Sequence, residues 1–414
     1  MIHYILFFFI FLFLIFYGYV KIKYPFWSCQ PVFHNYDFFR MILREPFIIN
    51  KNNPMKTKFC NFSNVKTNVY LDCKENSILE NTNLIQCFYL NTDRILFTLN
   101  KKDLDSIFSG HVEPPFLSIY FENEYKNTFD LSGSLISKNN IPIGSVSSRA
   151  VNLWYTNMSN QNKNYVEMKI NFVDYLCVNR NQNQKKVYRE LLQTHEYNTR
   201  ILNKNVQCSL IKKEIELFDG IIPFVNYNTL TYKLRNNRVE KLPIHTFIIK
   251  LEENKMDVLI DFLYTNNDYC MKTNLYDVLI FPDIGNIEQM IKQDLLYVYC
   301  LRNKEQIYGF YFFKDAKMYY EELECNTLHF VGSIMNCLQP TVFFQGFLHS
   351  IKNVLRTNDS FGMLLFENIG HNHVILQFWN TIYAPVFVNK TAYYLYNFVY
   401  PGSPLLANRV FVLH

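Results

Sequence analysis

The sequence predicts an α+β fold in which mixed sheets and helices form two halves of similar make-up. At 414 residues, the chain is long enough for two domains that each bury a core. Strand patterns of period two and helical patterns follow each other in a similar order in both halves, although no sequence repeat is detectable. The polar stretch 232–242 is the best linker candidate. We therefore expect halves over residues 21–235 and 236–414, preceded by an apolar segment over residues 1–20.

The N-terminal segment is almost free of charge. Residues 2–20 contain one His and no Asp, Glu, Lys or Arg. A helix of about 20 residues spans roughly 30 Å, the thickness of a bilayer core. A cleaved signal peptide is the alternative, but no basic residue precedes the run and no small-x-small site follows it. We therefore expect a single-pass transmembrane helix, and Lys21 and Lys23 predict that the rest of the chain faces the cytosol.

The first half becomes readable at residue 141, after a mixed and polar stretch over residues 59–137. Residues 103–108 predict a short helix, and residues 141–148 predict a strand that follows an Asn-Asn turn. Residues 166–172 alternate with period two, which is typical of a strand with one buried face, and the strand continues to Val178. A polar loop over residues 179–184 then leads into a helix on which apolar side chains recur at helical spacing.

The second half contains the same kinds of element. Residues 256–264 predict a helix, and residues 295–301 and 307–312 predict a hairpin. An amphipathic helix over 342–355 precedes a strand over 363–366. Chain ends are usually frayed and polar, but residues 410–413 are all apolar, so we expect a buried strand there.

Charge and cysteine content argue against two other classes of protein. The 41 basic and 36 acidic residues leave a net charge of +5, with no basic stripe between aromatic residues, so no nucleic-acid partner is expected. The ten cysteines are scattered singly, with no C-x-x-C pair and no Cys/His cluster at zinc spacing. We therefore expect no metal site, and thiols in a reducing compartment.

The loop over residues 179–184 is a candidate anion site. A helix N-terminus offers unpaired N–H groups and a positive dipole end, and Lys185 and Lys186 add charge where phosphates would bind. Taken alone, the segment is better explained as an ordinary strand–helix connection.

Four segments together resemble the N-myristoyltransferase family. Residues Phe26 to Val32 (FWSCQPV) match its F-W-x-T-Q-P-V box with Cys29 in place of Thr, and residues 44–47 (REPF) match R-x-E-P-aromatic with one residue fewer. Residues 174–179 (DYLCVN) match N-F-L-C-V-H, and residues 393–398 (YYLYNF) match Y-Y-L-Y-N-W. The four matches follow the order and spacing of the family. The resemblance covers residues 24–414, with thin stretches over 47–139 and 212–322.

The resemblance implies a fold and an activity. The fold would be two acetyltransferase-like (GNAT) halves that share a saddle-shaped mixed sheet. The activity would be direct transfer of myristate from myristoyl-CoA, a substrate and not a permanent cofactor, to the N-terminal glycine amine of a protein. The first half would bind myristoyl-CoA and the second half the peptide. The alternative is a degenerate homologue that binds acyl-CoA or lipidated protein without turnover. A purely structural membrane protein would leave four ordered matches to coincidence.

The family's functional residues fall on definite positions of this chain. The resemblance implies an oxyanion hole formed by the backbone N–H groups of Tyr175 and Leu176, and a base formed by the α-carboxylate of His414. It implies acyl-CoA contacts from Tyr24, Phe26, Trp27, Cys177, Val178, Asn183, Gln184, Lys185, Lys186 and Val187. It implies peptide contacts from Ser333 and Asn336.

Several family features are missing on the peptide side. The hydroxyl-bearing T-A-G segment reads Ile211-Lys212-Lys213, and the F-G-x-G-D-G run reads APVFVN over residues 384–389. The acidic stretch of the family is not visible near residues 91–93. These losses on the peptide side are the observation on which the degenerate alternative rests.

Overall fold

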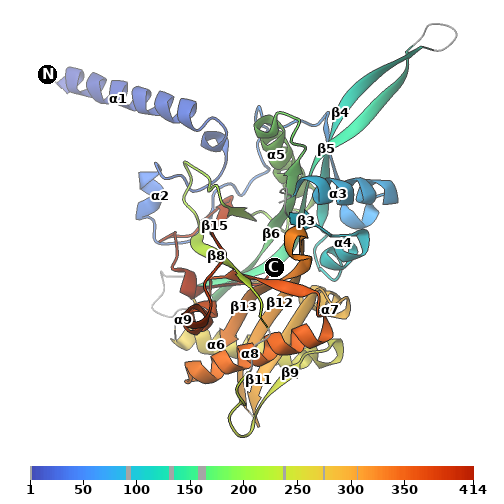
Figure 1. Ribbon diagram of the computed structural model, residues 1–414. Helices are drawn as coiled ribbons and strands as arrows, with labels where there is room; N and C mark the ends of the chain where they lie inside the picture. Colours follow the sequence, from blue (N-terminus) through green and yellow to red (C-terminus); the bar gives the residue numbers. More distant parts are fainter. Residues whose placement is uncertain are drawn as a thin grey trace.

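A large mixed sheet dominates the protein, and helices lie against it (Figure 1). The computed structural model describes residues 2–89, 95–129, 135–156, 165–235, 239–273, 276–304 and 306–414. Residues 91–93, and residues 236–238 of the expected linker, lie outside these ranges. The predicted α+β class with a mixed sheet is confirmed.

The N-terminal helix α1 (Ile2–Lys23) projects from the body of the protein, and most of its described side chains are exposed (Figure 1). Among the described residues, no helix combines the length and the apolarity needed to cross a membrane. The transmembrane helix expected over residues 1–20 is therefore not supported. The membrane attachment and the cytosolic orientation of the rest of the chain stay predictions from the sequence.

Within the described residues, the main sheet has 15 strands in the order β17-β10-β5-β6-β7-β15-β8-β14-β13-β12-β11-β9, with β2, β3 and β4 beside this path. Its strands are β2 (Val65–Val69), β3 (Ile95–Phe97), β4 (Phe116–Phe129), β5 (Leu135–Thr156), β6 (Tyr165–Val178), β7 (Ser209–Glu214), β8 (Val225–Lys233), β9 (Thr246–Lys250), β10 (Val278–Pro282), β11 (Leu296–Asn303), β12 (Gln306–Tyr320), β13 (Cys325–Met335), β14 (Phe361–Glu367), β15 (Phe387–Tyr396) and β17 (Val410–Val412). A separate pair joins β1 (Phe47–Ile48) to β16 (Phe398–Val399).

The helices after α1 are short to medium in length. They are α2 (Phe38–Ile42), α3 (Glu75–Phe88), α4 (Lys101–Phe108), α5 (Gln184–Leu202), α6 (Met256–Thr273), α7 (Ile284–Lys292), α8 (Pro340–Thr357) and α9 (Asn372–Ile382). The expected helices near residues 103, 256 and 342, the hairpin β11–β12 and the strands β6 and β14 are all confirmed.

Two parallel strand–helix–strand units explain the similar order of elements in the two halves. In the first βαβ unit, β6 leads through α5 to β7, and in the second βαβ unit, β13 leads through α8 to β14. The units meet through β15 and β8: β7 pairs with β15, β15 with β8, and β8 with β14. The two halves therefore share one continuous sheet.

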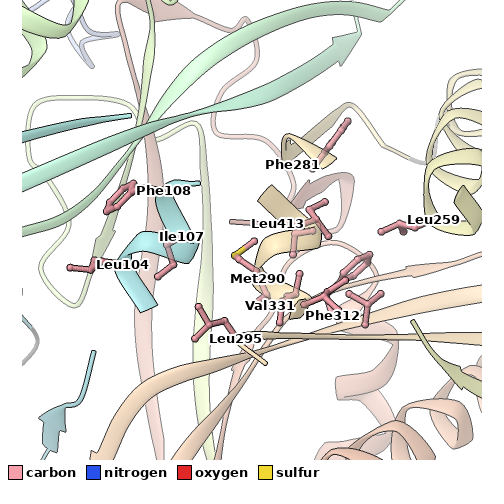
Figure 2. Packing of buried hydrophobic residues seen from close by; sticks show 14 of the residues in the cluster. Leu104, Ile107, Phe108, Leu259, Phe281, Met290, Leu295, Phe312, Val331 and Leu413 are labelled. Carbon is pink, nitrogen blue, oxygen red and sulfur yellow. The ribbon is translucent and has the colours of Figure 1, made fainter. Parts of the chain in front are cut away.

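The C-terminal strand lies inside the protein. Strand β17 pairs in parallel with β10, and Leu413 is only 1% exposed. Figure 2 shows Leu413 among Met290, Val331 and Phe312, which belong to the same buried cluster. The expected burial of this strand is confirmed, and it holds His414 inside the fold.

Candidate functional site

A cavity of about 1150 Å³ lies between the two βαβ units. One part of its wall is apolar and comes from the end of α3, from β3 and from α4: Tyr89, Ile95, Phe97, Leu99 and Ile107. Another part is polar and charged, and it comes from β7, β12, β13 and the end of the chain: Lys212, Glu214, Lys314, His329 and His414. A ligand that is apolar at one end and polar at the other matches this division.

Strand β6 carries a β-bulge at the cavity wall. Cys177 pairs with Ser145 and Asp174 with Ser147, so Tyr175 and Leu176 together oppose a single residue of β5. Tyr175 has φ 51°, in the left-handed region that non-glycine residues seldom adopt. Tyr175 and Leu176 both line the cavity, so the two residues predicted to supply oxyanion donors lie at its wall.

The first of these donors is engaged in the structure. The N–H of Tyr175 donates to Oδ1 of Asp174 at 2.9 Å, and Nη1 of Arg149 donates to Oδ2 of the same carboxylate at 3.1 Å. The Arg149 side chain is fully buried. A ligand oxygen that takes the Tyr175 N–H must therefore displace Asp174, while Arg149 continues to balance the charge of Asp174.

Helix α5 begins as the sequence predicts. Oδ1 of Asn183 accepts a hydrogen bond from the N–H of Lys186 at 3.2 Å and caps the helix. The side chains of Lys185 and Lys186 are exposed, and Gln184 lines the cavity. Val187 is buried beneath the first turn. The positive end of the α5 dipole, with two exposed ammonium groups, therefore stands at the rim of the cavity.

Cys177 and Val178 are buried in β6 directly after the bulge. Sγ of Cys177 lies 3.3 Å from the hydroxyl of Ser145. Burial raises the pKa of the Cys177 thiol to about 11, so the group is protonated at neutral pH. Cys177 is therefore suited to packing and not to nucleophilic attack.

The aromatic box near the N-terminus lies beside the cavity. Tyr24, Phe26 and Trp27 are not among the described residues that line it. Trp27 packs on Phe218 with ring centroids 4.7 Å apart, and Phe218 in turn lies 6.5 Å from Tyr188, which does line the cavity. Phe26 is buried against Trp27. The box thus reaches the cavity through two aromatic side chains of the first half.

His414 lies at the polar end of the cavity and is 7% exposed. Its ring is 4.7 Å from that of Phe172, and its Nδ1 lies 3.3 Å from the hydroxyl of Tyr393. Burial, together with the nearby Lys212, holds the pKa of its imidazole well below the ordinary value. The main-chain oxygen of His414 accepts a hydrogen bond from Nζ of Lys314 at 3.4 Å.

A buried charge network surrounds this chain end. Nζ of Lys212 lies 2.8 Å from carboxylate oxygens of both Glu214 and Glu367. Nε2 of His329 lies 2.9 Å from Glu367, and the hydroxyl of Tyr227 donates to Glu367 at 2.9 Å. Burial alone would raise the pKa of Glu367, but Lys212 and His329 hold it well below its ordinary value. Glu367 is therefore a buried carboxylate, fully paired.

The two predicted peptide contacts point elsewhere. The hydroxyl of Ser333 donates to Oδ1 of Asn372 at 2.8 Å, and the amide of Asn336 donates to the main-chain oxygen of Ile307 at 3.1 Å. Neither is among the described residues that line the cavity. Hydrogen bonds to α9 and to β12 direct these side chains into the scaffold.

Sequence reasoning missed Lys314 and Glu367 as site residues. Alternation along β12 places Lys314 on the same face as Phe310 and Phe312, which is a readable signal. No such signal marks Glu367, because its partner Lys212 is 155 residues away in the chain. Over the described ranges, no group of three His, Cys, Asp or Glu side chains is placed to hold a metal ion.

No protein-family model and no curated protein matches this sequence. Among solved structures, Saccharomyces cerevisiae N-myristoyltransferase with bound myristoyl-CoA matches with a TM-score of 0.67 and 12% identity, covering 94% of this chain and 99% of that chain. The same yeast enzyme with bound myristoyl-CoA and inhibitors matches with a TM-score of 0.63 and 13% identity, covering 93% of each chain. A tandem GNAT protein from the clavulanic acid biosynthesis pathway matches with a TM-score of 0.50 and 9% identity, covering 80% of this chain and 98% of that chain. The resemblance predicted from four short motifs is thus confirmed in three dimensions, and the chain has the fold of N-myristoyltransferase.

Proposed function

We propose that this protein transfers a myristoyl group from myristoyl-CoA to the N-terminal glycine amine of a protein or peptide. One observation carries the proposal: a single cavity brings together the Tyr175–Leu176 bulge, an apolar wall and the main chain of His414. The likeness to structures of N-myristoyltransferase with bound myristoyl-CoA supports it. Acyl transfer from myristoyl-CoA would use all three features.

The CoA part of the donor would bind at the start of α5. Lys185 and Lys186 are exposed beside the first-turn N–H groups of α5, and phosphates favour such a helix end. Gln184 continues this surface into the cavity. The aromatic box would cover the donor from the side, through Phe218 and Tyr188.

The acyl chain would occupy the apolar end of the cavity. Tyr89 and Phe97 pack edge to face at 5.2 Å, and Tyr89 lies 5.4 Å from Tyr175, so this wall adjoins the bulge. Burying a fourteen-carbon chain contributes on the order of 10 kcal/mol before the cost of ordering it. The thioester would then lie where the apolar wall meets the N–H groups of Tyr175 and Leu176.

Transfer would proceed by direct attack of the amine on the thioester. The carbonyl oxygen would displace Asp174 from the N–H of Tyr175 and take the N–H of Leu176 as its second donor; one such donor is typically worth about 10²–10³ in rate. The terminal carboxylate of His414 would accept a proton from the glycine ammonium. No acyl-enzyme is required, since the buried Cys177 is a protonated thiol.

The direct test combines radiolabelled myristoyl-CoA with a library of peptides that begin with glycine. We expect a myristoylated product with glycine-initiated peptides and none with N-acetylated or alanine-initiated controls. Binding of myristoyl-CoA without amide formation would leave only the degenerate alternative, and absence of binding would refute both.

A second test addresses the base. Adding one glycine after His414 moves the carboxylate away from Lys314 and the cavity, so we expect a loss of 10²–10⁴-fold in turnover, as for removal of a general base. Myristoyl-CoA affinity and the thermal midpoint should stay close to those of the unextended chain. Unchanged turnover would refute the assignment of the carboxylate.

A further inference from the structure

Lys314 is a half-buried lysine whose ammonium faces the chain end. It lies on β12 opposite Leu296 of β11 on one side and His329 of β13 on the other. Its Nζ donates to the main-chain oxygen of His414 at 3.4 Å, and the residue lines the cavity. Among the described residues, no carboxylate side chain lies within ion-pair distance of Lys314. The oxygen of His414 is thus the partner that the structure assigns to it.

The charged groups around Lys314 are committed to other partners. From β5 and β6, Arg149 and Asp174 face it but pair with each other. From β7 and β14, Lys212 and Glu367 likewise face it but pair with each other. The remaining titratable neighbours are His329, which is bound to Glu367, the imidazole of His414, and Asp315, which pairs with Lys317. Lys314 therefore lies at the cavity wall with no side-chain carboxylate left to pair with it.

The proton chemistry of this site needs an acceptor stronger than a carboxylate. An α-amine ordinarily titrates about four pH units above an α-carboxyl, so full proton transfer to the carboxylate is uphill by about 5.5 kcal/mol. Burial, assisted by the charge of Arg149, lowers the pKa of Lys314 to about 8. A pKa lowered toward that of an α-amine makes Lys314 a better-matched acceptor for the proton of a glycine ammonium than the carboxylate is.

We propose that Lys314 is the final acceptor of the proton that the substrate ammonium loses. The terminal carboxylate of His414 transfers this proton between the two amines. The inference rests on the proposed function and deepens it, because it names a proton acceptor that the sequence motifs do not include. Lys314 acts through the carboxylate and does not contact the thioester.

The three protons of the substrate ammonium reach three different destinations. The substrate ammonium gives one proton to the carboxylate, which gives a proton to the neutral amine of Lys314. The free amine attacks the thioester carbon; the C–N bond forms, the C–S bond then breaks, and CoA leaves as a thiolate. The thiolate takes a second proton from the nitrogen, and the third stays as the amide N–H. After product release, the Lys314 ammonium returns its proton to water.

The test compares Lys314→Met and Lys314→Arg with a matched strand lysine outside the cavity, Lys250→Met on β9. Wild-type turnover should rise with pH and level off near the pKa of Lys314, about 8. Lys314→Met should lower turnover by 10²–10⁴-fold and abolish that plateau. Lys314→Arg, which stays charged, should not restore turnover. Lys250→Met should behave as wild type.

Two readouts separate failure of this inference from failure of the proposed function. Myristoyl-CoA affinity should be the same in the wild type and in both Lys314 variants, and a thermal scan confirms that each variant folds. Turnover by Lys314→Met at the wild-type rate and with the wild-type pH profile would overturn the inference alone. A wild-type protein that binds myristoyl-CoA but forms no amide would overturn both the inference and the transfer step.

Discussion

The two βαβ units share a topology but differ at the point where the helix begins. In the first βαβ unit, β6 bulges at Tyr175, and α5 begins with exposed lysines above a capped first turn. In the second βαβ unit, α8 begins at Pro340 and buries Val342, Phe343 and Phe344 within its first turns. The first unit therefore has exposed charged side chains where its helix begins beside the cavity, whereas the second buries apolar side chains in the core.

Two glycines, one on β13 of the second βαβ unit and one on the neighbouring β12, show how tightly this region is packed. A Cβ added at Gly332 would lie 2.9 Å from the ring of Phe411, and one added at Gly309 would lie 2.7 Å from the ring of Phe343. Phe411 of the C-terminal strand and Phe343 of α8 thus pack directly against the backbone of these two glycines. The first βαβ unit, by contrast, borders the cavity. The two units thus share a topology without sharing a site. The first would bind myristoyl-CoA, whereas the second packs against the C-terminal segment that carries His414.

The largest expected effect concerns the glutamates that end the last strand of each unit. Glu214 ends β7 and Glu367 ends β14, and both lie 2.8 Å from Lys212. The side chain of Glu367 is fully buried, whereas that of Glu214 is 25% exposed. Removing one partner of a buried pair costs about 3–5 kcal/mol, so Glu367→Gln should lower the free energy of unfolding by that amount. Glu214→Gln should cost about 1 kcal/mol or less.

The same pair predicts a pH dependence. Because the pKa of Glu367 is held below its ordinary value, its contribution to stability is present above about pH 4.5 and is lost as the pH falls further. Urea titrations between pH 3 and pH 7 should therefore show a steep acid loss in the wild type and a shallower one in Glu367→Gln. Equal costs for the two variants at pH 7 would contradict the stated difference in burial.

The contrast between the units also marks what the sequence reveals and what it does not. The period-two pattern of β6, the helical spacing after Lys186 and the apolar run at the chain end each report a local rule of burial, and the structure follows them. The two-unit architecture was visible as a similar order of elements. These features depend on near neighbours in the chain, which a single sequence displays.

The site depends on contacts that the sequence does not display. The left-handed Tyr175 results from the register between β5 and β6, and its N–H is engaged by Asp174 where the family motif has Asn. The expected peptide contact Ser333 is directed away by Asn372, which lies 39 residues further along the chain. Register and long-range pairing are tertiary properties, so the motifs predict candidate site residues without giving the geometry around them.

A smaller effect on stability is expected when a methyl group is added to the tightly packed second βαβ unit. Gly332→Ala places a methyl group against the ring of Phe411, and overpacking of this kind costs about 1–3 kcal/mol. The control is Gly18→Ala in α1, where no atom lies within 4 Å of the new Cβ. A lower thermal midpoint for Gly332→Ala and an unchanged one for Gly18→Ala would confirm that the second unit has no spare space. Equal thermal midpoints for the two variants would instead show that β17 shifts to accommodate the methyl group without a loss of stability.

The smallest expected effect tests whether the N-terminal end of α5 binds myristoyl-CoA. In the double variant Lys185→Gln with Lys186→Gln, two exposed charges beside the first turn of α5 are removed. We expect the Kd for myristoyl-CoA to rise about tenfold, and the wild-type Kd to rise with salt more steeply than that of the variant. Lys352→Gln on α8 is the control in the second unit and should leave the Kd unchanged. A double variant that binds like the wild type would place the phosphates away from α5, because two nearby ammonium groups cannot be removed from a phosphate site without a loss of affinity.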